Sequence, residues 1–214
     1  MRPKLLIFDC DGVLVDSEPL SHRVLVSLLA ESGVTLTHDE ALSRFLGKST
    51  AQSIDILNDL IGPGRGAEFM LRFKQQMRGV FERELRPVPG IEGALDQLKV
   101  PCWVASSGEP EKMRLTLGVT GLLPRFEGRL TSVVEVAHPK PAPDVYLLAA
   151  HKAGFAPPDC VVVEDSPTGV AAGVAAGMRV LGYAAVTPGR VLLEAGAHRV
   201  FDSMSELPSL LEAL

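Results

Sequence analysis

Cysteine, aromatic residues and positive charge are all scarce in this sequence of 214 residues. Aromatic residues make up 5% of the chain, and the formal net charge is -5 at pH 7. A surface that binds nucleic acid needs clustered Lys and Arg to displace counterions, so we expect no nucleic-acid partner. The cysteines lie far apart and share no CxxC spacing, which argues against a disulfide framework and a zinc site. They are Cys10, Cys102 and Cys160.

Long hydrophobic runs are missing as well. The first apolar run, Leu5–Phe8, is too short for the core of a signal peptide and far too short to span a bilayer. We therefore expect a cytoplasmic protein with no membrane partner. The oligomeric state stays open, with a monomer favoured.

What the sequence does contain is a large apolar fraction arranged in short runs. Hydrophobic residues make up 46% of the chain, enough for one sizeable core and a smaller appended unit. Short apolar runs between turn residues are typical of buried parallel strands, here Leu5–Phe8, Cys102–Ala105, Cys160–Val163 and Val180–Tyr183. Stretches with helical length and composition alternate with them, at Glu111–Leu117, Pro143–Ala153 and Thr168–Ala176. This alternation predicts an α/β protein with a doubly wound parallel sheet.

One interval has helical periodicity and no convincing strand. It runs from about Ser17 to Leu85 and returns through Arg86–Gly90, where prolines and a glycine suit a stiff connection. We predict that residues 17–86 form a helical insertion, and that residues 1–16 and 87–214 form the α/β core.

Two aspartates follow the first predicted strand directly. Asp9 and Asp11 emerge at the carboxyl end of Leu5–Phe8, where open α/β sheets place their ligands, and Gly12 allows a sharp turn. Carboxylates two residues apart can hold a hard cation, or one can attack phosphorus while the other handles a proton. The competing interpretation is an ordinary turn after a strand.

A second pair of carboxylates follows another predicted strand. Glu164 and Asp165 come directly after Cys160–Val163. Adjacent carboxylates are costly at such a place unless a cation such as Mg²⁺ or solvent compensates them. The competing interpretation treats Asp165 and Ser166 as an N-terminal helix cap.

Two further segments offer groups that bind phosphate. Ser106 and Ser107 follow the strand Cys102–Ala105 and can cradle phosphate oxygens with a hydroxyl and backbone amides, although a plain turn explains them equally well. Lys140 lies between prolines that restrict the backbone. Its charge can neutralise the charge shared by Asp9 and an incoming phosphate.

Taken in order, these segments resemble the four signature motifs of the haloacid dehalogenase-like hydrolase superfamily. The segments are Asp9–Val13, Ser106, Lys140–Asp144 and Glu164–Ser166, and the resemblance covers essentially the whole chain. Asp16–Glu18 and Gly169–Gly177 also match the subgroup with a helical cap inserted after the first motif. That subgroup includes beta-phosphoglucomutase and many phosphatases of small metabolites. The resemblance implies a Rossmann-like core with an inserted α-helical cap.

The resemblance also implies roles for individual residues. Asp9 is expected to be the nucleophile that forms an aspartyl-phosphate, and Asp11 the general acid and base. Ser106 and Lys140 are expected to bind the transferring phosphoryl group. Magnesium is the implied cofactor, with expected ligands at Asp9, the Asp11 backbone carbonyl, Asp165 and Glu164, the last directly or through water. Contacts with a small phosphorylated substrate are expected at Ser107, Gly47 and Lys48.

Several activities are compatible with this resemblance, and individual residues favour some of them over others. Asp11 disfavours dehalogenation, because a halide leaving group needs no proton. Ser21 and Thr50 stand where beta-phosphoglucomutase has a cap histidine and an arginine for the second phosphate. We therefore expect a phosphatase acting on a sugar phosphate or sugar-acid phosphate, with a sugar phosphomutase as the alternative. A non-catalytic metabolite-binding protein is a third hypothesis, which the intact acidic residues disfavour.

Overall fold

The chain divides into two compact units, which are described separately. The computed structural model describes residues 3–45 and 50–214. The α/β unit comprises Met1–Asp16 and Arg86–Leu214, and the helical unit comprises Ser17–Leu85.

A parallel six-stranded sheet forms the centre of the α/β unit, with strand order β3-β2-β1-β4-β5-β6. Its apolar sequences explain this arrangement, because β1 and β4 are buried along their whole length as central parallel strands require. The strands are β1 (Leu5–Phe8), β2 (Cys102–Ser106), β3 (Leu130–Ser132), β4 (Cys160–Glu164), β5 (Arg179–Tyr183) and β6 (Arg199–Phe201).

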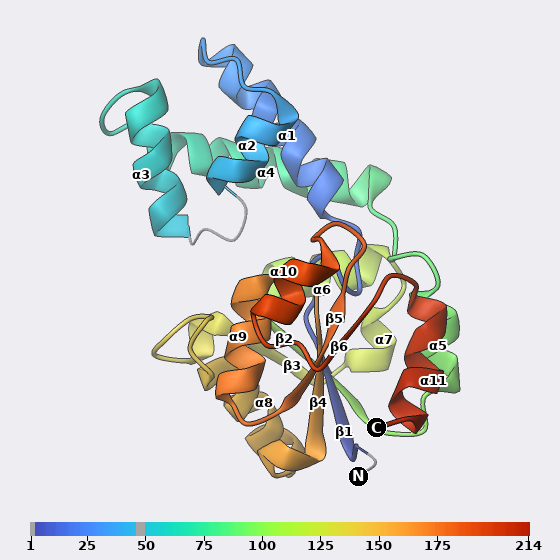
Figure 1. The fold of residues 1–214 in the computed structure, drawn as a ribbon. Coiled ribbons are helices and arrows are strands. Elements are labelled where there is room, and N and C mark those ends of the chain that lie inside the picture. Colours follow the sequence, from blue (N-terminus) through green and yellow to red (C-terminus); the bar gives the residue numbers. More distant parts are fainter. Residues whose placement is uncertain (1–2, 46–49) are drawn as a thin grey trace. The chain divides into compact units, whose positions relative to one another are not determined.

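Helices cover both faces of this sheet, and Figure 1 shows α8 and α9 on one side with α5, α7 and α11 on the other. The helices are α5 (Ile91–Gln97), α6 (Pro110–Val119), α7 (Leu123–Phe126), α8 (Asp144–Ala153), α9 (Pro167–Ala175), α10 (Gly189–Glu194) and α11 (Leu207–Glu212). Short 3₁₀ turns occupy Val133–Glu135, Pro157–Asp159 and Met204–Glu206.

Side-chain alternation divides the core of the α/β unit between the two faces of the sheet. Leu5 and Ile7 of β1 belong to one buried cluster with Tyr146 of α8 and Val170 of α9. Phe8, which points to the opposite face, packs edge-on against Phe126 of α7 with 6.3 Å between ring centroids. Both faces of the central strands are therefore apolar, and the buried carboxylates Asp9 and Glu164 lie where β1 and β4 end.

The observed sheet confirms the predicted fold class. The apolar runs predicted as strands correspond to β1, β2, β4 and β5, and the predicted helices correspond to α6, α8 and α9. The edge strands β3 and β6 were absent from the sequence-based prediction. Each has three residues, too few for a run of apolar residues to stand out.

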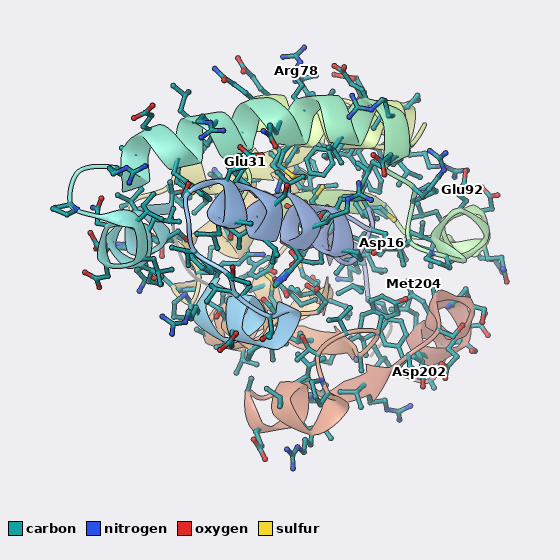
Figure 2. The ribbon with its side chains drawn as sticks, turned by 90° about the horizontal axis from the view of Figure 1, so that it is seen from above. Asp16, Glu31, Arg78, Glu92, Asp202 and Met204 are labelled. Atoms are coloured by element: carbon teal, nitrogen blue, oxygen red, sulfur yellow. The ribbon has the colours of Figure 1, made fainter. Side chains whose placement is uncertain are left out.

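The described residues of the helical unit form four helices, and α1 contacts α2 and α4 while α3 contacts α4. They are α1 (Glu18–Glu31), α2 (His38–Phe45), α3 (Thr50–Ile61) and α4 (Gly66–Glu84). Leu28 and Leu29 of α1 are completely buried, and Phe69 and Phe81 of α4 nearly so. The opposite face of α4 is charged, and Figure 2 shows Arg78 pointing away from α1. Helix α4 is therefore amphipathic, with an apolar face toward the other helices of this unit and a charged face opposite.

The two segments that connect the units are paired with each other inside the α/β unit. The Asp16 amide donates to the Arg86 carbonyl at 3.0 Å, and the Val88 amide donates to the Leu14 carbonyl at 3.0 Å. Val15 and Pro87 form an antiparallel bridge between these bonds. The chain thus leaves the α/β unit and returns to it at the same place. Among the described residues, no helix has the length and apolar content needed to cross a membrane.

Candidate active site

The candidate site lies where β1 and β4 end side by side. Phe8 pairs with Val163 in the parallel register, so Asp9 and Glu164 occupy neighbouring positions at the carboxyl ends. The Asp9 amide also donates to the Val163 carbonyl at 3.0 Å. From β1 the sheet continues through β2 to β3 on one side, and from β4 it continues through β5 to β6 on the other. Open α/β sheets bind their ligands at the carboxyl ends of the two strands where the strand order reverses in this way.

Lys140 joins the two strand ends through its ammonium group. Its Nζ donates to Asp9 Oδ1 at 2.6 Å and to Glu164 Oε1 at 2.8 Å. The side chains of Lys140, Asp9 and Glu164 are 5%, 10% and 1% exposed, so the ion pairs are shielded from water. A third bond, from Nζ to the Ala105 carbonyl at 3.3 Å, ties the lysine to β2. One cation therefore links three adjacent strands.

Both oxygens of Glu164 are held in place. Oε1 accepts from the Tyr146 hydroxyl at 3.0 Å as well as from Lys140, and Oε2 accepts from the Ser166 amide at 2.8 Å and its hydroxyl at 3.0 Å. Gly169 makes room for this carboxylate, because a Cβ there would lie 1.6 Å from Glu164 Oε1. The glycine that sequence analysis assigned to a family motif thus has a local steric reason.

Burial and neighbouring charge shift the acidities of this group. Burial raises the pKa of Asp9 to about 7, against the opposing effect of Lys140 and with a further rise from Glu164 and Asp11. Burial would also raise the pKa of Glu164, but Lys140 and Ser166 outweigh it and lower that pKa. Burial would lower the pKa of Lys140, yet Asp9 and Glu164 raise it well above its ordinary value. Lys140 is therefore a permanent cation beside a nucleophile candidate that its surroundings make less acidic.

The turn after β1 carries the second aspartate. Asp11 Oδ2 accepts from Lys112 Nζ of α6 at 2.7 Å. Gly12 has φ 76, a left-handed conformation that favours glycine. A Cβ at Gly12 would also lie 2.0 Å from Asp165 Oδ2, so the Asp165 carboxylate rests directly against this turn. A glycine is therefore favoured at this position for two reasons: the left-handed backbone conformation and the close approach of the Asp165 carboxylate.

The loop after β2 presents a hydroxyl and backbone groups at the same edge of the sheet. Ser106 is buried, and its Oγ accepts from the Gly108 amide at 3.0 Å. The Gly108 carbonyl accepts in turn from the Ser132 hydroxyl at 2.6 Å, which anchors the loop to the end of β3. Ser107 is exposed. Lys140 contacts Ala105, which precedes Ser106 in β2, so the end of β2 belongs to the same cluster.

The structure therefore brings together most of the predicted site residues at one edge of the sheet. Gly47 and Lys48, predicted to contact substrate, lie outside the described residues. Sequence analysis missed Lys112 and Tyr146, which contact Asp11 and Glu164. Both lie on helices that were predicted, but only the folded chain shows which helical positions face the strand ends.

Comparison with known proteins decides the family. Residues 3–177 match the profile of the haloacid dehalogenase-like hydrolases. The chain belongs to this family. Membership confirms the predicted family, and the phosphatases among its relatives support the predicted enzyme class, a phosphoric monoester hydrolase.

Relatives within the haloacid dehalogenase-like family match this chain over nearly its full length. The 6-phosphogluconate phosphatase of Escherichia coli K12 is 30% identical over 99% of this chain and 96% of its own. A family hydrolase from Deinococcus radiodurans R1, solved with bound phosphate and sodium, is 33% identical with TM-score 0.82, covering 99% and 96% of the two chains. A protein from Thermotoga maritima, provisionally described as a beta-phosphoglucomutase, is 27% identical with TM-score 0.81 and covers 99% of both chains.

Proposed function

We propose that this protein is a magnesium-dependent phosphatase that hydrolyses a small phosphorylated metabolite, a sugar phosphate or sugar-acid phosphate, through an aspartyl-phosphate on Asp9. The observation that carries the proposal is the buried contact of Lys140 with Asp9 beside the Ser106 loop. This arrangement places a nucleophile, a fixed cation and phosphate-binding groups together. Phosphoryl transfer depends mainly on such positioning and on stabilisation of negative charge.

The residues at the strand ends fit a magnesium ion. Mg²⁺ is bound by oxygen ligands and commonly uses only one or two carboxylates together with waters. The proposed protein ligands are Asp9, Asp165 and the Asp11 carbonyl, and Gly12 allows Asp165 to rest against the segment that carries the other two. No cluster of three or more His, Cys, Asp or Glu suited to a metal occurs within residues 3–45 and 50–214.

Glu164 takes a different role in this proposal from that of a direct metal ligand. Its two oxygens already accept bonds from Lys140, Tyr146 and Ser166. We therefore assign Glu164 to fixing Lys140, with any influence on the metal passing through water. When bound, the metal would supply positive charge to the phosphoryl oxygens.

The first proposed step transfers the phosphoryl group to the protein. Lys140 occupies Asp9 Oδ1, so Oδ2 is the proposed attacking atom. It forms a bond to phosphorus as the bond from phosphorus to the ester oxygen breaks, and the leaving oxygen takes a proton from Asp11. The products are the free alcohol, the aspartyl-phosphate and an ionised Asp11. Lys140 and Ser106 bind the charge on the phosphoryl oxygens throughout.

The second proposed step returns the protein to its starting state. Asp11, now ionised, accepts a proton from a water molecule that attacks phosphorus. The bond between phosphorus and Asp9 breaks, which releases inorganic phosphate and regenerates the Asp9 carboxylate. Asp11 is protonated again and ready for the next ester. Each proton given in the first step is thus recovered in the second.

A phosphate-release screen tests this function. Purified protein with Mg²⁺ is assayed on 6-phosphogluconate, cyclic and open-chain sugar phosphates, and p-nitrophenyl phosphate. We expect hydrolysis that a chelator abolishes and added Mg²⁺ restores. Asp9→Asn, which keeps the shape of the side chain but removes the nucleophile, should reduce kcat by about a thousandfold or more. Full activity in Asp9→Asn would overturn the mechanism, and no phosphate release by the unmodified protein would overturn the function.

A sugar phosphomutase is the second candidate, supported by the structural likeness to the Thermotoga maritima protein. Ser21 and Thr50 weigh against it, because neither supplies the charge with which the mutase cap grips a second phosphate. Incubation with a hexose 1-phosphate and a catalytic amount of bisphosphate separates the two activities. A phosphatase releases inorganic phosphate, whereas a mutase forms the hexose 6-phosphate.

A further inference from the structure

Lys112 forms an ion pair with the residue assigned as the proton donor. Its Nζ lies 2.7 Å from Asp11 Oδ2, and the two side chains are 41% and 20% exposed. Asp11 follows β1, whereas Lys112 lies in the first turns of α6, so the contact joins segments distant in the sequence. Neither the family motifs nor the spacing of charges in the sequence indicated this contact.

The stem of Lys112 follows the loop that carries Ser106. A Cβ placed on Gly108 would lie 3.5 Å from Lys112 Cδ and 3.4 Å from Ser106 Oγ. Both side chains therefore lie close to Gly108. The lysine therefore passes along the phosphate-binding loop before its ammonium group reaches Asp11. Such a path restricts where the ammonium group can go.

Thr116, one turn further along α6, fixes this part of the helix beside the Asp9–Asp11 segment. Its Oγ1 donates to the Lys112 carbonyl at 3.0 Å and lies 3.9 Å from the sulfur of Cys10. Cys10 and Thr116 are both buried. The backbone of Lys112 is thus tied to the helix, and the helix contacts the residue between the two aspartates. Lys112 consequently approaches Asp11 from a supported position.

We propose that Lys112 is a positioning residue that holds the carboxylate of Asp11 for proton transfer, an inference that rests on the proposed function. The bond from Lys112 to Oδ2 restricts rotation of the carboxylate that gives a proton to the leaving group and later takes one from water. An aspartate beside a glycine turn has several rotamers, and a wrongly turned carboxylate transfers no proton. The ion pair therefore acts by orienting the Asp11 carboxylate, because a partly exposed pair contributes little to the stability of the fold.

The test compares three esters whose leaving oxygens need a proton to different extents: p-nitrophenyl phosphate, phenyl phosphate and 6-phosphogluconate. Lys112→Met keeps the apolar stem and removes the charge. The quantity compared is kcat/KM, because it reports the first irreversible step, cleavage of the ester bond. We expect kcat/KM to fall on the order of tenfold for 6-phosphogluconate and less than about twofold for p-nitrophenyl phosphate, since general acid catalysis matters most for poor leaving groups.

Two further variants serve as controls. Lys112→Arg restores a cation that can reach Asp11, and it should recover most of the loss on 6-phosphogluconate. Lys4→Met removes the exposed Lys4–Asp159 ion pair at the opposite end of β1 and β4, and it should behave as the unmodified protein on every ester. Unfolding curves for all three variants should coincide within error, which separates orientation of Asp11 from loss of folded protein.

The outcomes separate this inference from the proposed function. Equal losses of kcat/KM on all three esters in Lys112→Met would show contact with the phosphoryl group and overturn the positioning role. Unchanged kinetics in Lys112→Met would overturn it too, while leaving the phosphatase function intact. If the unmodified protein hydrolysed none of the esters, the function and this role would fall together.

Discussion

A lysine meets carboxylates at both ends of strands β1 and β4, and the two ends differ in burial. At the amino ends, Lys4 and Asp159 form an ion pair of 3.1 Å with side chains 59% and 22% exposed. At the carboxyl ends, Lys140 binds Asp9 and Glu164 with side chains 5%, 10% and 1% exposed. Similar ion pairs at the two ends of the same strands thus differ in their exposure to water.

This contrast shows that burial, more than the presence of an ion pair, decides how strongly the loss of one charge affects stability and activity. An exposed pair gains little, because water solvates its members nearly as well when they are apart. A buried pair cannot lose one member without leaving an uncompensated charge in a poorly solvating environment. The buried cluster is consequently rigid and sensitive to change, whereas the exposed pair is replaceable. Four substitutions test this contrast, from the largest expected effect to the smallest.

Lys140→Met should have the largest effect. It removes the cation that Asp9 and Glu164 share, and we expect a loss of about 3–5 kcal/mol in the free energy of unfolding. Activity should fall by about a thousandfold, since the charge that binds the transferring group is lost. Urea unfolding and phosphate release measure the two effects. Stability and activity close to those of the unmodified protein would contradict the role given to Lys140.

Gly169→Ala should come second. The added Cβ would lie 1.6 Å from Glu164 Oε1, so the carboxylate must move and Lys140 must follow it. We expect a loss of about 1–3 kcal/mol in stability from overpacking, and about a hundredfold in activity from misplaced groups.

The matched control is Gly93→Ala in α5, where nothing lies within 4 Å of an added Cβ. Better helix propensity should stabilise that variant by about 0.5–1 kcal/mol. The comparison uses thermal unfolding and kcat. Equal responses at the two glycines would disprove the steric role of Gly169.

Tyr146→Phe should have a moderate effect. It removes the hydroxyl that donates to Glu164 Oε1 at 3.0 Å but keeps the ring, over which Lys140 Nζ lies 4.7 Å from the centroid. Loss of one hydrogen bond to a charged group should cost about 1.5–3 kcal/mol in unfolding free energy. Activity should fall only severalfold, because Lys140 and Ser166 still hold Glu164.

Tyr183→Phe provides the matching control for Tyr146→Phe. Tyr183 lies on β5 and packs against Phe201, with 5.3 Å between ring centroids, and burial and the carboxylates of Asp16, Asp202 and Asp165 raise its pKa. The same atom is thus removed without loss of a bond to Glu164, and steady-state kinetics should show a smaller loss of kcat than for Tyr146→Phe. If Tyr183→Phe lowered kcat as much as Tyr146→Phe, the effect would not depend on the contact with Glu164.

Lys4→Met should have the smallest effect. The exposed pair with Asp159 is expected to contribute less than about 1 kcal/mol, and the catalytic constants should stay unchanged. Urea unfolding at low and high salt provides the measurement, because any small contribution should disappear when salt screens the charges. A loss comparable to that of Lys140→Met would remove the contrast between the two ends of the strands.

Sequence alone predicted the sheet well where its strands are central. Strands such as β1 and β4 are buried on both faces, and their continuous apolar runs record this directly. Two of the three residues of the edge strand β3 (Leu130–Ser132) are polar, and the strand pairs with β2 at the edge of the sheet. Its stability comes from tertiary contacts, which a short window of sequence does not contain.

The site was predictable to the extent that it consists of residues following strands. Asp9 and Glu164 were expected to meet because parallel strands bring their carboxyl ends to one edge. Lys112 and Tyr146 could not be found in this way, because their roles depend on how α6 and α8 are rotated against the sheet. The anchoring of Glu164 by three different partners likewise needs three-dimensional information.

The paired segments at Asp16 and Arg86 make the helical unit an exchangeable module. Since these residues are already joined by a hydrogen bond of 3.0 Å, an insert of any length whose ends lie close together can replace residues 17–85 without stretching the sheet. The entropy of closing such an insert grows only slowly with its length. Grafting unrelated inserts at this junction is therefore a route to engineering the protein that leaves the strand ends and their charges unchanged.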